Sequence, residues 1–278
     1  MLKRKPIDLI VNADDYGYFP CVSQGILDIA RAGRLTATGV LANSPNLTPQ
    51  LSGLDAIGRL DIGVHLNLTS GRPLTQAMAE KLSQWNGCFP DAYRMSMMVL
   101  TGKIGIGVVR AEWQAQIDVC RAGRRDLRFL NSHEHIHMLP VLFKLVLRLA
   151  EENRIAHVRL TRAEWLRPFG LSALLRNGLI QCMQSINQKR SGIRSPLFLG
   201  LGQSGKLDLD YLAKIFSRLK PGVSYELMCH PGYFEPKQIS EPSLLAYHDW
   251  EKETALLLSS ELQELYENFG IRLSHYQN

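Results

Sequence analysis

Short apolar runs alternate with amphipathic segments along most of this 278-residue chain, and that alternation limits the folds it can adopt. Apolar runs typical of buried strands lie at 7–12, 35–42, 61–68, 127–132, 156–160, 223–229 and 271–275. Segments with apolar residues at helical spacing separate them, most clearly at 22–32, 108–122, 140–153, 209–219 and 244–269. Strands separated by helices pair in parallel through right-handed crossovers. We therefore predict an α/β fold, an irregular (β/α) barrel related to the TIM barrel, with an open doubly wound sheet as the alternative.

The length and composition fit one globular α/β domain, with 45% hydrophobic and 21% charged residues. We predict a single domain over 1–278, with a basic helical insertion at about 163–195. No apolar stretch approaches the ~20 residues that a membrane helix needs. The run at 7–11 is too short and too acidic for the core of a signal peptide. We therefore expect a cytoplasmic protein.

The net charge of +6 is unevenly distributed. Residues 110–194 carry 15 Lys and Arg against 7 Asp and Glu, so the rest of the chain sums to −2. This basic sector indicates either an anionic partner, such as phosphate, nucleic acid or an acidic lipid surface, or a solvated basic face. It lacks the interleaved aromatic residues of a nucleic-acid binder, so we expect no nucleic-acid partner.

The five cysteines are scattered and include no Cys-x-x-Cys pair, which argues against a disulfide framework or a structural zinc site. Cys229 adjoins His230, so a nucleophilic thiol is one interpretation. We favour a buried, unreactive cysteine at the end of a strand.

Polar clusters follow four of the apolar runs, at 12–17, 63–67, 131–137 and 228–232. The carboxyl ends of parallel strands meet at one face of a sheet or barrel, where α/β proteins build their sites. The sequence therefore predicts that the polar side chains of these clusters converge.

These clusters contain the residue types of a metal centre with an acid and a base beside it. Asp15, His65 and His133 would form a site of two histidines and one carboxylate, which leaves positions open for water and substrate. Asp14 could take a proton from the water, and His230 could donate one to a leaving amine. The same ligand set occurs in non-haem iron oxygenases, so it does not fix the reaction.

A triplet of alternating histidines, His133, His135 and His137, strengthens the metal interpretation. In an extended segment these three side chains face the same side, which packing alone explains poorly. With the strand ending near Ser132, His133 lies at the mouth of the barrel. His135 and His137 are then expected to support the metal site or contact the substrate.

With these motifs in place, the sequence resembles the YdjC-like (ChbG/HpnK) family of carbohydrate deacetylases. The matching pieces span nearly the whole chain in the family's order. They are Asn12-Ala13-Asp14-Asp15-Tyr16-Gly17, Gly33-x-Leu35-Thr36-Ala37-Thr38, Gly63-Val64-His65, Ser132-His133-x-His135-x-His137-Met138-x-Pro140 and Met228-Cys229-His230-Pro231.

The resemblance implies an enzyme that removes acetyl groups from N-acetylated amino sugars, using a divalent metal on a barrel-like α/β fold. By position, the resemblance assigns roles to Asp15, His65 and His133 as metal ligands, to Asp14 as the base and to His230 as the acid. The ion would be zinc, nickel, cobalt or manganese, with magnesium suited less well. Homologues that dimerise imply a homodimer.

By the same resemblance, Arg159 matches a basic position of the family, and its side chain would hold a carboxylate or the substrate. We group Arg159 with His135 and His137 as candidate substrate-binding residues. Family members that act on chitin-type oligosaccharides carry Asp and His where this chain has Asn131 and Glu134, which leaves the sugar preference open.

The insertion carries apolar residues at helical spacing within a basic surround. The apolar positions are Leu171, Leu174, Leu175, Leu179, Met183 and Ile186, and the basic ones are Arg167, Arg176, Lys189, Arg190 and Arg194. Such a helix can sit on an anionic membrane, or it can pack on the barrel or on a dimer partner.

Some members of the family act on a polyprenyl-phosphate-linked N-acetyl sugar at the cytoplasmic face, in lipid A modification. We expect a substrate of this kind, met during peripheral membrane contact, with a chitooligosaccharide as the alternative. A hydrolase of another amide or ester, or a non-catalytic sugar- or nucleic-acid-binding protein, would also fit parts of the pattern.

Overall fold

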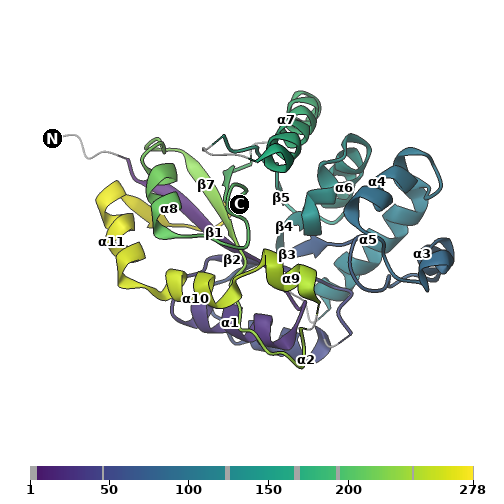
Figure 1. Cartoon of the computed structure of the whole chain (residues 1–278), viewed down its shortest axis with the longest axis horizontal. Coiled ribbons are helices and arrows are strands. Elements are labelled where there is room, and N and C mark those ends of the chain that lie inside the picture. Colours follow the sequence, from purple (N-terminus) through teal and green to yellow (C-terminus); the bar gives the residue numbers. More distant parts are fainter. Residues whose placement is uncertain are drawn as a thin grey trace.

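The computed structural model describes residues 5–45, 47–122, 126–165, 170–191, 195–239 and 241–277. Its centre is one sheet of parallel strands surrounded by helices (Figure 1). The strands are β1 (Ile7–Tyr16), β2 (Ala37–Val40), β3 (Asp61–Leu66), β4 (Leu127–Ser132), β5 (His157–Val158), β6 (Leu197–Leu199), β7 (Ser224–Cys229) and β8 (Ile271–Leu273).

The strand order is β5-β4-β3-β2-β1-β7-β6, and β8 pairs with the start of β1. Every strand pair is parallel, as expected for strands joined through helices. Within the described residues no strand pairing joins β5 to β6, so the barrel is open between them. The prediction of an irregular (β/α) barrel is confirmed, whereas the single-domain assignment stays a prediction.

The helices cover the outside of the sheet (Figure 1). They are α1 (Pro20–Arg31), α2 (Leu47–Asp55), α3 (Gln76–Lys81), α4 (Ala92–Leu100), α5 (Ile106–Arg121), α6 (Pro140–Glu152), α7 (Leu171–Ser191), α8 (Leu209–Phe216), α9 (Pro242–Tyr247), α10 (Trp250–Leu258) and α11 (Ser260–Phe269). Two 3₁₀ turns, η1 (Ser83–Trp85) and η2 (His133–Met138), complete the described elements.

The predicted helical segment at 244–269 divides into the end of α9, then α10 and α11. Ser259 leaves the helical conformation and caps α11, where its hydroxyl accepts a hydrogen bond from the N–H of Leu262. Gly270 adopts φ 64° and ends α11, a conformation that glycine takes without strain. The chain can then turn directly into β8.

Alternate residues of the strands face two different environments. The larger apolar core lies between the sheet and the helices and includes Leu9 and Val11 of β1. A small second cluster lies on the inner face of the barrel, made of Ile10, Ala37, Phe129 and Tyr276. Farther along β1 on that inner face, polar side chains replace apolar ones, and they carry the site.

The predicted first strand continues beyond residue 12 to Tyr16, so Asp14 and Asp15 belong to the strand and do not follow it. The pairing of β1 with β2 is irregular between Ala13 and Tyr16, and Asp15 has a left-handed backbone with φ 68°. A bulge of this kind re-aims side chains. It explains how two adjacent residues of a strand both reach one site.

Within the described part of the chain, no helix is both long enough and apolar enough to cross a bilayer.

Candidate metal centre

Asp15, His65 and His133 converge from β1, β3 and η2. Asp15 Oδ1 lies 2.9 Å from His133 Nδ1 and 3.2 Å from His65 Nε2. One ligand atom from each of the three residues lies within 4.8 Å of the others. Asp15 and His65 are buried, and the His133 side chain is 12% exposed. The structure thus brings together the three residues predicted to bind metal, in an arrangement open on one side.

Asn131 sets the proton position on His65. Its Nδ2 lies 2.9 Å from Asp14 Oδ1, and because a carboxylate only accepts, the amide nitrogen must donate there. The amide oxygen then faces His65 Nδ1 at 2.8 Å, so that ring nitrogen is the donor. The lone pair of His65 is left on Nε2, which faces Asp15. Outer-shell hydrogen bonds of this kind orient metal-binding histidines.

Asn131 bridges His65 and Asp14. It accepts from His65 and donates to Asp14 at the same time. An aspartate in its place could accept from His65 but would set a second negative charge against Asp14.

Arg159 clamps Asp14. Its Nη1 donates to Asp14 Oδ2 at 2.6 Å, and its Nη2 donates to Asp14 Oδ1 at 2.9 Å. Burial raises the pKa of Asp14, but the charge and the hydrogen bonds of Arg159 outweigh burial and lower the pKa to about 2. The carboxylate predicted to be the base is therefore ionised and held in one orientation.

The Arg159 side chain has no exposed surface, so it has no free edge for a substrate. Of the two roles considered for it, holding a carboxylate or holding substrate, the structure supports the first. Its grouping as a substrate-binding residue stays a prediction, and the structure encloses the guanidinium between two carboxylates.

The second of those carboxylates, Glu226 in β7, was missed by the sequence analysis. Arg159 donates to Glu226 Oε1 through Nε at 2.7 Å, and its Nη2 lies 2.6 Å from the same oxygen. A signal was available, because Glu226 interrupts an otherwise apolar strand and a buried acid needs a partner.

The buried charges fit a divalent cation. Arg159 is ion-paired with Asp14 and Glu226, whereas Asp15 pairs only with histidines among the described residues. Three carboxylates thus stand beside one fixed cation. Burial lowers the pKa of His133, but Asp15 outweighs this and raises it. A divalent ion held by Asp15, His65 and His133 would supply the missing positive charge.

The expectation that alternating histidines share one side was wrong. Residues 133–138 form the turn η2 instead of an extended segment, because Glu134 (φ 50°) and His135 (φ 55°) adopt left-handed backbones. His135 is half-buried, with Nδ1 3.3 Å from the hydroxyl of Thr161.

His137 is fully buried, and both its ring nitrogens are engaged within the protein. Nδ1 lies 2.6 Å from the Ser132 hydroxyl, and Nε2 lies 2.9 Å from the backbone oxygen of Arg159. Burial lowers its pKa to about 3, so the ring is neutral. His137 thus anchors η2 to the backbone of Arg159, a supporting role beside the metal site, and its grouping as a substrate-binding residue stays a prediction.

His230 follows β7 and is 8% exposed. Its backbone N–H donates to Glu253 Oε2 at 2.6 Å, a contact that sequence reasoning did not predict. Its Nδ1 is buried and has no hydrogen-bond partner among the described residues. Burial lowers the pKa of His230, although Asp15 and Asp14 oppose this, so the neutral ring is favoured.

The neighbouring thiol behaves as expected. Cys229 is buried, its Sγ lies 3.4 Å from the backbone oxygen of Asn12, and burial raises its pKa well above the usual value. A protonated thiol is a poor nucleophile.

A cavity of about 650 Å³ lies in the loops that follow β1, β2 and β3. Its lining includes Tyr18, Phe19, Lys237, Gln238 and Glu241. The Tyr18 ring packs edge-on against His133, with centroids 5.4 Å apart, so the cavity adjoins the candidate metal centre. Its size is that of a small-molecule site.

Comparison with known proteins extends over nearly the whole chain. Residues 8–268 match the model of the family described as YdjC-like protein. A carbohydrate deacetylase of Geobacillus stearothermophilus is 28% identical over 274 residues, covering 96% of each chain. A chitooligosaccharide deacetylase of Citrobacter koseri is 27% identical over 272 residues, covering 96% of this chain and 97% of the relative. A carbohydrate deacetylase of Xenopus laevis is 28% identical over 253 residues, covering 82% of each.

Among solved structures, a putative cellobiose-phosphate cleavage protein from Enterococcus faecalis superimposes with a TM-score of 0.75 at 24% identity. The match covers 98% of both chains, so the two proteins share their fold from end to end.

Proposed function

The chain belongs to the YdjC-like family, and on this premise we propose that it is a metal-dependent hydrolase that removes the acetyl group from an N-acetylated amino sugar. The observation that carries the proposal is the convergence of Asp15, His65 and His133 beside an ionised Asp14. Relatives named carbohydrate deacetylase, matched over most of their length, support the choice of substrate class.

Asp15, His65 and His133 would hold a divalent ion, which would supply Lewis acidity to a water and to the acetyl carbonyl. Asp14, fixed by Arg159, accepts the proton of the attacking water. His230 would deliver a proton to the leaving amine from its protonated form, a minor species that is more acidic because burial lowers the pKa of the ring. Because its Nδ1 is buried, the transfer falls to Nε2.

The sugar would occupy the cavity beside the metal centre. Tyr18 and Phe19, with ring centroids 4.4 Å apart, offer an apolar surface to the face of a sugar ring. Lys237, Gln238 and Glu241 offer polar groups to its hydroxyls. Polar groups placed beside apolar surface fix the orientation of a ligand in small-molecule sites.

Acetate release tests this function. Chelator-treated protein would receive zinc, nickel, cobalt, manganese or magnesium singly, with chitooligosaccharides and polyprenyl-phosphate N-acetylhexosamines as substrates. We expect release only with metal added. Folded, metal-loaded protein that releases no acetate from any of these sugars would reject the proposal in favour of another amide or ester, or of binding alone.

We also propose that α7 rests on an anionic membrane and that the substrate is a polyprenyl-phosphate-linked N-acetylhexosamine, with a chitooligosaccharide as the alternative. Leu174, Leu175 and Leu179 of the predicted apolar stripe are 41%, 68% and 62% exposed. The helix docks through Ile180 and Met183, which pack with Phe198. Two amides also hold it, with Asn177 Nδ2 donating to the backbone oxygen of Glu164 and Asn187 Nδ2 to that of Met138. Outward leucines beside basic residues fit a lipid surface.

Several residues of that prediction cannot be placed. Arg167, Arg194 and the side chains of Leu171 and Arg190 lie outside the described residues. Flotation with anionic and with neutral vesicles tests the membrane proposal, using Leu175→Ser combined with Leu179→Ser. We expect anionic vesicles to carry the parent protein and not the double variant, and equal behaviour of the two proteins would contradict it. A homodimer also stays a prediction.

A further inference from the structure

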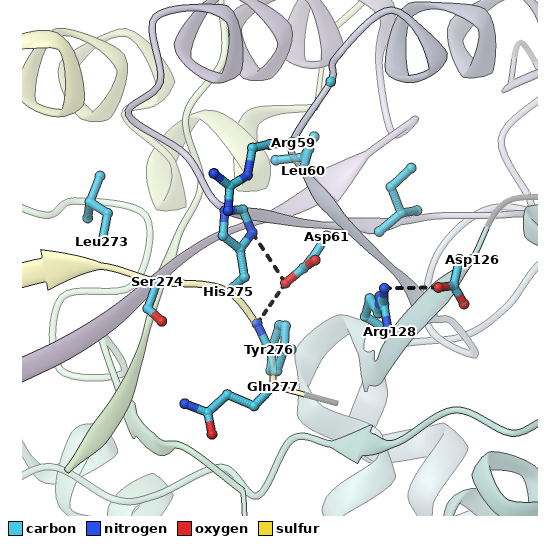
Figure 2. Close-up of a pocket in the computed structure, with 12 residues that line it drawn as sticks. Arg59, Leu60, Asp61, Asp126, Arg128, Leu273, Ser274, His275, Tyr276 and Gln277 are labelled. Atoms are coloured by element: carbon cyan, nitrogen blue, oxygen red, sulfur yellow. Dashed lines mark hydrogen bonds and ion pairs between the residues drawn. The ribbon is translucent and has the colours of Figure 1, made fainter. Parts of the chain in front are cut away.

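The C-terminal segment crosses the amino end of the barrel, opposite the metal centre. After β8, the N–H of Ser274 donates to the Leu9 oxygen, and the N–H of Tyr276 donates to Asp61 Oδ2 at 2.7 Å. His157 Nε2, at the start of β5, lies 2.5 Å from the oxygen of Gln277. Figure 2 shows this segment beside Asp61, where it lines a cavity of about 740 Å³. The segment therefore ties β1, β3 and β5 together.

The Tyr276 side chain enters the barrel and is 6% exposed. Its ring stacks on Phe129, with centroids 4.7 Å apart and planes at 25°, and it packs with Ile10 and Ala37. The ring thus fills the inner face of the barrel below the polar site.

The Tyr276 hydroxyl reaches the polar groups above this apolar cluster. It lies 3.4 Å from Asn12 Nδ2, which donates to it. Asn12 Nδ2 also donates to Glu226 Oε1 at 3.0 Å. The side chain of Asn12 therefore links the Tyr276 hydroxyl to Glu226.

Glu226 links Asn12 to Arg159 by hydrogen bonds. The oxygen that accepts from Asn12 also accepts from Arg159, and Arg159 grips both oxygens of Asp14. A continuous chain of buried hydrogen bonds therefore runs from the C-terminal segment through Glu226 and Arg159 to the carboxylate proposed as the base. In a dry interior, a carboxylate that loses a donor shifts toward its remaining partners.

We propose that Tyr276 is a positioning residue, whose hydroxyl fixes the Asn12 amide and through it Glu226 and the orientation of Arg159 and Asp14. Its effect on catalysis rests on the proposed function, whereas its effect on Arg159 does not. The last residues of the chain then belong to the catalytic apparatus, although they lie at the opposite end of the barrel.

Tyr276→Phe tests the proposal, because it keeps the stacked ring and removes only the hydroxyl. The matched control is Tyr266→Phe, since the Tyr266 hydroxyl is also buried but has no hydrogen-bond partner in the described part of the chain. We expect Tyr276→Phe to lower kcat by about tenfold, with KM changed less than about twofold. Tyr266→Phe should match the parent protein in both.

A double-mutant cycle shows whether the hydroxyl acts through Glu226. Tyr276→Phe should add little to the loss already caused by Glu226→Gln. Full multiplication of the two losses would mean that the hydroxyl acts elsewhere and would overturn the proposal.

A readout independent of activity separates this proposal from the proposed function. The Nε–H of Arg159, buried against Glu226, can be followed by nitrogen-edited proton NMR and assigned with Arg159→Lys. Its exchange with solvent should accelerate by about tenfold or more in Tyr276→Phe and stay unchanged in Tyr266→Phe. Unchanged exchange in Tyr276→Phe overturns the positioning role. Faster exchange in a protein without deacetylase activity would uphold that role and reject only the proposed function.

Discussion

Arg159 grips both carboxylate oxygens of Asp14, through Nη1 at 2.6 Å and Nη2 at 2.9 Å. This contact lowers the pKa of Asp14 despite its burial, to about 2. A carboxylate with so low a proton affinity is a weak base toward ordinary water. The proposed reaction therefore depends on a strongly acidified water, which agrees with a metal centre beside Asp14.

The first prediction concerns the hydrogen bonds between Arg159 and Asp14. Arg159→Lys keeps a positive charge but loses the fork that spans Asp14 and Glu226. We expect kcat to fall by about 100-fold and the free energy of unfolding by ~3–5 kcal/mol, because two buried carboxylates lose their shared partner. Enzyme kinetics and urea unfolding measure the two effects.

The matched control for the clamp is Arg272→Lys. Arg272 pairs with Asp8 at 2.7 Å, but its side chain is 64% exposed. An exposed pair contributes little, so this change should alter stability by less than ~1 kcal/mol. Equal losses in the two variants would show that burial of Arg159 is not what makes it important.

The second prediction concerns metal removal. Chelation should lower the unfolding temperature, and adding metal should raise it again in a concentration-dependent way. Because Asp15 raises the pKa of His133 against the opposing effect of burial, protons compete with the ion, and metal affinity should fall as the pH falls. Isothermal titration at several pH values measures this, with His275→Gln as a control far from the centre. Metal affinity independent of pH would exclude His133 as a ligand.

The third prediction concerns Glu253, which accepts from the backbone N–H groups of His230 and Leu207. Burial raises its pKa to about 7, despite these two hydrogen bonds. A raised folded-state pKa gives stability that is complete below the unfolded value, near 4.5, and lost as the pH rises through about 7. The loss is of the order of 3 kcal/mol at most.

Urea unfolding between about pH 5 and pH 8 measures that loss. The Glu253→Gln variant cannot ionise at this position, so its stability should decline less over the same range. Parallel profiles for the two proteins would contradict the assignment to Glu253.

The fourth prediction concerns the cavity beside the metal centre. Phe19→Ala should raise KM for the sugar about tenfold with a smaller change in kcat, because it removes the binding surface and leaves the reacting groups in place. Phe234→Ala is the control, since Phe234 is 39% exposed and is absent from the cavity lining. A Phe19→Ala variant with the parent KM would place the sugar elsewhere.

The sequence could predict that the site residues converge, because the pattern that places each of them at the end of a strand is local. Asp14, Asp15, His65 and His133 each follow or end a buried apolar run, and parallel strands bring such ends together. The strand-and-helix alternation predicted the barrel for the same reason.

Glu226 and Tyr276 were not predicted, because their roles depend on contacts across the barrel. Glu226 lies within a strand and Tyr276 lies two residues from the C-terminus, so neither belongs to a strand-end cluster. The prediction of an extended segment at 133–137 was wrong because Glu134 and His135 adopt left-handed backbones. No glycine is present there to signal such a conformation.

The exposed leucines of α7 show a different limit of prediction from sequence. Periodicity correctly located a helix, but only part of the predicted apolar stripe docks. Met183 packs beside Ile180 in an apolar cluster. On the same face, Asn177 and Asn187 donate to the backbone oxygens of Glu164 and Met138. Such pairings depend on loops whose positions the sequence pattern does not reveal.

The most direct test measures metal content and acetate release on the same samples of parent protein, Asp14→Asn and Asp15→Asn. The account predicts that Asp14→Asn binds the ion as the parent does but releases no acetate, whereas Asp15→Asn loses both. Acetate release at the parent rate by metal-loaded Asp14→Asn would contradict it.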